Sequence, residues 1–145
     1  MATRSTIAFY LPEMNYVPSI YCHYDGSPEF VGQALWLEYN SFDKAFELAS
    51  SGAIRGLLSD KRNENGYYDV LPFEKLEFFE EFHLPEMNRS FDELATNFLN
   101  SDRDWMYVWF QKEGWMIYRK NWENNSVEFF GSLNKFMEKF LKENA

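Results

Sequence analysis

The chain has 145 residues, 46% of them hydrophobic and 26% charged, a composition that excludes a disordered polymer and a length that suits one domain. Its 23 acidic residues exceed its 14 lysines and arginines and give a net charge of −9, which argues against broad binding to nucleic-acid phosphates. The single cysteine excludes an intramolecular disulfide framework, and no apolar run reaches the length of a membrane span. We therefore expect a single domain over residues 1–145 in a reducing, cytoplasmic setting.

The N-terminal residues predict a β-hairpin that leads into a helix. Within residues 3–24, two runs rich in β-branched and aromatic side chains flank a turn at residues 12–15. Ser27 and Pro28 then have the chemistry of a helix start, because serine caps free amides and proline suits the first helical position. This helix is expected to run to about Tyr39.

Three more helices are predicted in the middle of the chain. An Asn-Ser pair precedes residues 42–51 and predicts a capped helix there. Residues 73–82 carry apolar side chains on one side and glutamates around the other, as an amphipathic helix does. Ser90 and Glu93 have the spacing of a capping box and start a helix over residues 90–99.

The C-terminal residues predict a second hairpin and a last helix. Aromatic runs at residues 105–110 and 115–118 flank a turn at residues 111–114. Alternation puts rings on one face of the first run and other apolar side chains on its second face, which indicates a strand covered on both sides or a sheet face used for binding. A helix is expected from residues 125–128 to about Lys142. Its buried face is expected to comprise Val127, Phe130, Leu133, Met137, Phe140 and Leu141.

Together these elements predict an α+β fold. We expect an antiparallel sheet built from the N-terminal and C-terminal hairpins, with helices packed mainly on one face. Residues 60–104 hold twelve acids against five bases. We interpret this segment as an acidic helical insertion.

Residues 19–29 place several chemically active side chains where a strand leads into a helix. Strand alternation puts Tyr21, His23 and Asp25 on one face, so the Asp25 carboxylate could orient the His23 imidazole. The amides after Ser27 could bind an anion. The same residues also fit a purely structural role in which the Asp-Gly pair makes the turn. The candidate ligand-binding residues are Tyr21, His23, Tyr24, Asp25, Gly26 and Ser27.

Four short motifs stand near the N-terminus: Thr-Arg-Ser-Thr-Ile at 3–7, Ser-Ile-Tyr-Cys-His-Tyr-Asp-Gly at 19–26, Pro28-Glu29 and Val31-Gly32. Together they resemble a family of small, mostly uncharacterised bacteriophage accessory proteins. In that family a similar hairpin carries Tyr-Cys-His-(Trp/Tyr)-Asp-Gly and leads into a helix with Val-Gly. The resemblance covers roughly the first 60 residues. It implies a phage protein acting in the host cytoplasm and transfers no catalytic residue.

The acidic middle of the chain predicts a different kind of site. Carboxylates spaced along helices could imitate spaced phosphates and be steered toward a basic, nucleic-acid-binding protein. The plain alternative is that the helices of an acidic protein expose solvated glutamates. The candidate partner-binding residues are Glu74, Glu77, Glu80, Glu81, Glu86, Asp92 and Glu93.

Signals for catalysis and for metal binding are weak. Two histidines and one cysteine are few soft ligands, and the acids lack calcium-loop spacing, so no metal and no cofactor are expected. There is no phosphate-cradling glycine loop and no nucleophile elbow, and Cys22 and His23 point apart on one strand.

We therefore hypothesise a non-enzymatic bacteriophage accessory or anti-defence protein that binds and modulates a basic or nucleic-acid-binding host protein, with no direct nucleic-acid or membrane contact. The alternative is a binder of a small, nucleotide-like ligand at the loop around His23 and Asp25. The aromatic content of 20% is also compatible with a homo-oligomer.

Overall fold

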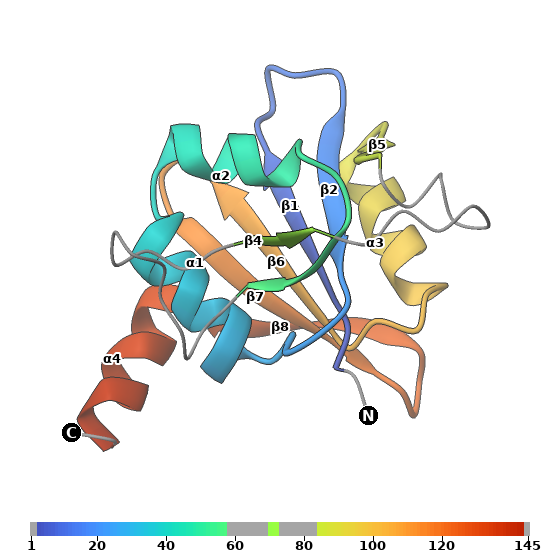
Figure 1. Ribbon diagram of the computed structural model, residues 1–145. Helices are drawn as coiled ribbons and strands as arrows, with labels where there is room; N and C mark the ends of the chain where they lie inside the picture. The colour runs from blue at the N-terminus through green and yellow to red at the C-terminus, as the bar shows by residue number, and fades with distance from the viewer. Residues whose placement is uncertain (1–2, 58–69, 73–83, 144–145) are drawn as a thin grey trace.

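One sheet of eight strands organises the described residues (Figure 1). The computed structural model describes residues 3–57, 70–72 and 84–143. The strands are β1 (Ser5–Tyr10), β2 (Val17–Cys22), β3 (Ile54–Leu57), β4 (Val70–Pro72), β5 (Glu86–Asn88), β6 (Trp105–Phe110), β7 (Gly114–Asn121) and β8 (Ser126–Ser132). The helical segments are the π-helical turn η1 (Pro28–Gly32), α1 (Gln33–Glu38), α2 (Phe42–Ala49), α3 (Phe91–Leu99) and α4 (Leu133–Glu143).

The sheet joins an N-terminal hairpin to a C-terminal three-strand meander. The strand order is β4-β3-β2-β1-β6-β7-β8, and β5 pairs with β2 beside this path. The two hairpins meet where β1 and β6 pair in parallel, from Ser5 opposite Trp105 to Tyr10 opposite Phe110. The predicted α+β fold with a mostly antiparallel sheet is confirmed. The sequence did not predict this parallel pairing or the parallel contact between β2 and β3.

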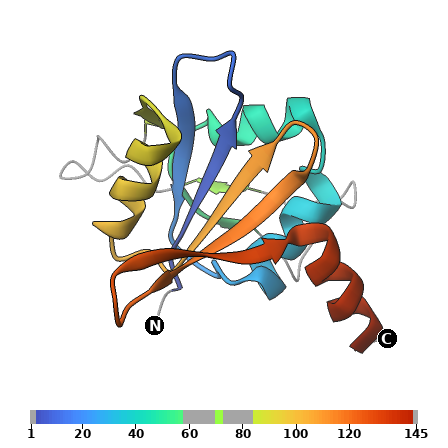
Figure 2. The ribbon, with the colours of Figure 1, turned by 180° about the vertical axis from the view of Figure 1, so that it is seen from behind.

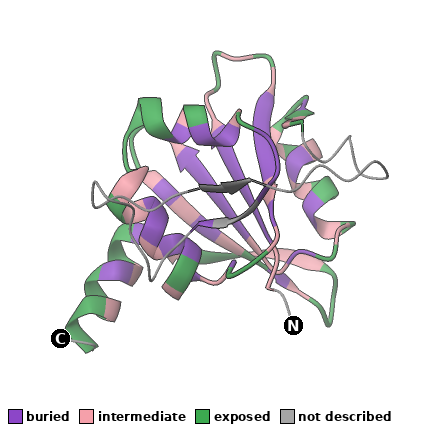
Figure 3. Ribbon diagram, viewed as in Figure 1, coloured by how far each residue is buried: buried purple, intermediate pink, exposed green. Residues whose placement is uncertain are grey.

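Helices cover both faces of the sheet unequally. Residues of η1, α1, α2 and α4 pack into the larger core on one face, whereas α3 covers the other face (Figures 1 and 2). Burial is concentrated in the central strands (Figure 3). In β6, Tyr107 faces the larger core and Val108 faces α3, and both are fully buried. The prediction of a central strand covered on two sides is therefore confirmed, and β6 offers no open face for binding.

The helix caps in the middle of the chain follow the predicted chemistry. The Ser41 hydroxyl accepts a hydrogen bond from the Lys44 amide at the start of α2, and the Ser90 hydroxyl accepts one from the Glu93 amide at the start of α3. Ser27 is extended, as an N-cap residue is, but its side chain makes no capping bond, and the predicted helix begins instead as the turn η1. None of the helices in the described ranges is long and apolar enough to cross a bilayer.

The predicted start of the last helix is wrong. Residues 126–132 form β8, and α4 begins only at Leu133, where the Ser132 hydroxyl accepts a hydrogen bond from the Lys135 amide. Two local features explain the difference. Asn125 adopts a left-handed conformation with φ +52°, which turns the chain back as a hairpin, and Arg119 donates a hydrogen bond across the strands to Glu128.

The described part of the predicted acidic insertion is built into the fold. In this segment β5 pairs with β2, and the buried Asn88 side chain donates hydrogen bonds to the Val17 carbonyl and the Ser19 hydroxyl. Leu94 and Phe98 of α3 fill the core on the second face of the sheet. The helix predicted at residues 73–82 lies outside the described residues.

Arg103, just before β6, ties three strands together. Its guanidinium donates to Thr6 Oγ1 at 2.8 Å and to the two Glu86 carboxylate oxygens at 2.9 and 3.4 Å. It also lies 4.8 Å from the centroid of the Tyr21 ring. Because the arginine side chain is only 11% exposed, the carboxylate beside it compensates a cation that would otherwise be costly to bury.

Replacing Arg103 with methionine is expected to lower the free energy of unfolding by about 2 kcal/mol, because Glu86 and Thr6 lose the hydrogen bonds that the guanidinium donates and Glu86 loses its ion pair. Denaturant-induced unfolding measures this loss. The matched control is Arg89→Met, which removes the ion pair to Glu93 from a side chain that is 89% exposed and should leave the stability almost unchanged. Equal small effects for both variants would show that Arg103 does not hold the strands together.

Candidate functional site

The structure brings together three of the predicted ligand-binding residues at the end of β2. Tyr21 Oη lies 2.5 Å from His23 Nδ1, within hydrogen-bond distance, and the rings of His23 and Tyr24 pack edge to face at 4.4 Å. Asp25 is exposed and adopts a left-handed conformation with φ +56°. The grouping that strand alternation predicted therefore forms around Tyr21 and His23, while Asp25 serves the turn.

The backbone of this loop anchors the first helix to the sheet. The Gly26 amide donates to the Thr3 carbonyl at 2.9 Å, and the Gly26 carbonyl accepts a hydrogen bond from the buried Tyr107 hydroxyl at 2.6 Å. A Cβ on Gly26 would lie 2.8 Å from the Thr3 carbonyl oxygen, so no other residue fits there without movement. These contacts favour the structural role of the Asp-Gly pair.

The amides after Ser27 make a poor anion site. Pro28 has no amide hydrogen, and the amides of Phe30 and Val31 already donate to the Ser27 carbonyl. The carboxylate of Glu29 also lies in this first turn, where it would repel an anion. The hypothesis of a nucleotide-like ligand at Ser27 thus loses the Phe30 and Val31 amides as donors.

The Cys22 thiol is expected to be unreactive. It is completely buried on the core side of β2, and its thiol donates to the Tyr24 carbonyl at 3.5 Å. Burial raises the pKa of the Cys22 thiol to about 12, since an ionised sulfur would be desolvated there. The residue therefore has little thiolate character at neutral pH.

The predicted acidic surface is partly neutralised where the structure describes it. Glu86 is paired with Arg103 at 2.9 Å and Glu93 with Arg89 at 2.8 Å, while Asp92 is exposed on α3. Hydrogen bonds from Arg89 lower the pKa of Glu93. The remaining candidates lie outside the described residues: Glu74, Glu77, Glu80 and Glu81. Among the described residues, these acids do not form an uncompensated carboxylate array.

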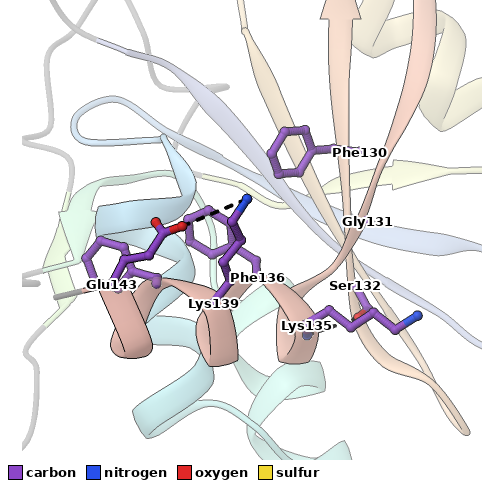
Figure 4. Close-up of a pocket in the computed structure, with 8 residues that line it drawn as sticks. Phe130, Gly131, Ser132, Lys135, Phe136, Lys139 and Glu143 are labelled. Carbon is purple, nitrogen blue, oxygen red and sulfur yellow. Dashed lines mark hydrogen bonds and ion pairs between the residues drawn. The ribbon is translucent and has the colours of Figure 1, made fainter. Parts of the chain in front are cut away.

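A groove that the sequence did not predict lies between β8 and α4 (Figure 4). We call it the β8–α4 groove, and its volume is about 380 Å³. Phe130 points into it from β8, and Phe136 and Phe140 line it from successive turns of α4. The Phe136 and Phe140 rings stack at 5.9 Å, and Phe130 lies 6.2 Å from Phe136. The complete lining is Phe130, Gly131, Ser132, Lys135, Phe136, Lys139, Phe140 and Glu143.

A β-bulge shapes the floor of this groove. Tyr118 pairs with Phe129 and Ile117 with Gly131, so Phe130 is the extra residue between two regular pairs. Gly131 has φ +154° and no side chain, which leaves the floor open next to the Phe130 ring. A bulge that redirects one side chain at a sheet edge is a recurrent feature of binding sites.

The Phe130 ring is held from behind by its neighbours. Trp105 packs edge to face against it at 5.1 Å, and the Arg119 guanidinium lies 5.3 Å from its centroid. Phe130 is nevertheless 39% exposed. Phe130 is therefore positioned and yet accessible.

Lysines form the rim of the groove. Lys135 and Lys139 stand one helical turn apart on α4, and Lys139 contacts Glu143 at 3.9 Å. Both members of that pair are largely exposed, 78% and 62%, so their attraction is weak and readily exchanged for another partner. The groove thus combines an aromatic floor with exposed cationic side chains at its edge.

The described residues give no indication of a metal centre. In that part of the chain no cluster of three or more histidines, cysteines or acids has the geometry of a metal site. Comparisons with protein-family models, with curated proteins and with solved structures return no match to this chain. The geometry of the β8–α4 groove is therefore the basis on which a function is inferred.

Cys22 should react with a thiol reagent at pH 8 at least about 100-fold more slowly in the folded protein than in denaturant. With a pKa of about 12, roughly one thiol in ten thousand is ionised at that pH, and the fold also blocks access. Absorbance-monitored labelling with a disulfide reagent measures both rates. Labelling as fast in the folded as in the unfolded protein would restore Cys22 as a candidate nucleophile.

Proposed function

We propose that this chain acts by binding another protein, without catalysis, and that the β8–α4 groove is its docking surface. The observation that carries the proposal is an accessible aromatic floor directly beside an edge strand. Phe130 on β8 is 39% exposed, and Phe136 and Phe140 on α4 are half-buried beside it. Large apolar side chains gathered on a surface mark places where proteins associate.

The strand edge supports the same proposal. β8 ends the strand order, and no described strand pairs with its outer side. Alternate residues of an edge strand direct their amide and carbonyl groups outward, so a partner segment can add a strand there by backbone hydrogen bonds. The groove then supplies side-chain contacts that backbone pairing alone lacks.

The resemblance of the N-terminal motifs to bacteriophage accessory proteins makes a host protein the expected partner, and modulation of that protein, as in anti-defence, the expected outcome. The version of this hypothesis that relies on an acidic surface has less support, because Glu86 and Glu93 are ion-paired. We therefore assign the contact to the C-terminal part of the chain, where aromatic side chains line the groove.

Phe130→Ser should reduce the recovery of bound host proteins at least tenfold, because loss of a central aromatic anchor typically costs 2 kcal/mol or more, about a thirtyfold change in affinity. Isotope-labelled affinity capture from host cells, using the tagged wild-type chain and its variants, measures the change. The matched control is Phe42→Ser on α2, a position with the same exposure, 40%, away from the groove.

Thermal unfolding should first show that both variants are folded. Equal recovery with wild type and Phe130→Ser, equal loss with Phe42→Ser, or no protein above a tag-only control would each contradict a docking role for the groove.

A further inference from the structure

We propose that the β8–α4 groove recognises an acidic segment of its partner, one that inserts an aromatic side chain against Phe130, Phe136 and Phe140 and places carboxylates beside Lys135 and Lys139. This inference rests on the proposed protein-binding function and specifies the chemistry of the partner. It excludes a basic partner at this surface, the opposite of what the acidic middle of the chain predicts.

The size and lining of the groove define the apolar part of the ligand. A volume of about 380 Å³ lies at the lower end of the roughly 300–1,000 Å³ of ligand pockets, which suits one or two side chains. The floor continues a chain of ring contacts that runs from Trp105 to Phe130, Phe136 and Phe140. Because such rings favour stacked or edge-to-face neighbours at 4.5–7 Å, a further aromatic ring extends the series best.

The distribution of charge along the chain defines the polar part of the ligand. Residues 105–145 hold six lysines and arginines against five acids, while the rest of the chain holds eight against eighteen. An acidic segment is therefore repelled by most of the protein and least opposed at this end. Lys135 and Lys139 line the groove itself, so they fix where carboxylates meet the surface. Glu143 holds Lys139 only weakly, at 3.9 Å, and a carboxylate of the partner can replace it.

The strand edge gives the segment its direction. Regular pairing of β8 with β7 runs from residue 126 to Phe129 before the bulge at Phe130 interrupts it. An added strand can therefore pair along residues 126–129, and its following residues meet the groove beyond the bulge. Backbone pairing and side-chain insertion are thereby available to one continuous extended segment.

A second copy of this chain fits the groove less well. Antiparallel pairing of two β8 edges would place the β7–β8 turn of one copy beside the groove of the other, and a closed turn cannot continue along the groove as an extended segment does. Self-association is thus an alternative outcome that the experiment must detect.

The test is selection from a display library of random twelve-residue peptides with the full wild-type chain as bait. Enrichment of acidic residues next to an aromatic residue is expected, and synthetic versions of the selected peptides should bind more weakly as salt rises. Lys139→Glu should weaken their binding at least tenfold, whereas Lys112→Glu, an exposed lysine in the β6–β7 turn, should change it less than twofold. Both substitutions change the net charge equally.

Three outcomes would overturn the inference: selected peptides without acidic enrichment, no selected peptide at all, or equal weakening by the two lysine variants. A dimer in sedimentation experiments that Lys139→Glu abolishes would also overturn it in favour of a second copy. If apolar, uncharged peptides bind in a way that Phe130→Ser prevents, the docking function stands and only the acidic specificity fails. If capture from host cells is also independent of Phe130, both proposals fail together.

Discussion

The parallel pairing of β1 with β6 is the constraint on which the rest of the fold depends. It joins two hairpins that are about a hundred residues apart in the chain into one sheet, and it makes both strands central. Strands that are central and apolar on both faces need cover on both sides, which η1, α1, α2 and α4 provide on one face and α3 on the other. The three-strand meander ends at β8, whose outer edge no described strand pairs with and whose Phe130 stays partly exposed.

The sequence predicted the features that local chemistry determines. The hairpins follow from their turn residues. The helix caps at Ser41 and Ser90 follow from hydroxyl side chains that directly precede segments with helical apolar periodicity. The pairing of β1 with β6 carried no such signal, because nothing local states which distant strand a strand will join. The pattern predicts a helix over residues 126–132 because their apolar positions fit the helical period as well as the strand period. The left-handed turn at Asn125 and the hydrogen bond from Arg119 to Glu128 across the strands favour the strand.

The candidate sites show the same difference between what local sequence predicts and what tertiary contacts determine. Strand alternation correctly grouped Tyr21 with His23, yet the loop's hydrogen bonds go into anchoring the fold through Gly26 and Tyr107. The sequence did not predict the groove because Phe130 and Phe140 fit the periodicity of a buried helix face, on which both were expected. The exposure of Phe140 depends on how far α4 extends past the edge of the sheet, and tertiary geometry alone sets that distance. The aromatic floor, the lysines at the rim and the unpaired edge of β8 are therefore brought together only by the tertiary structure.

The central claim is that the partner docks along β8 and α4. Amide hydrogen exchange of the chain, alone and with its captured partner, tests it most directly, because exchange reports which backbone segments gain protection on binding. The account predicts slower exchange across residues 126–143 in the complex, with little change elsewhere. Protection that appears instead over α3 or over the loop at residues 19–29, with residues 126–143 unchanged, would contradict it.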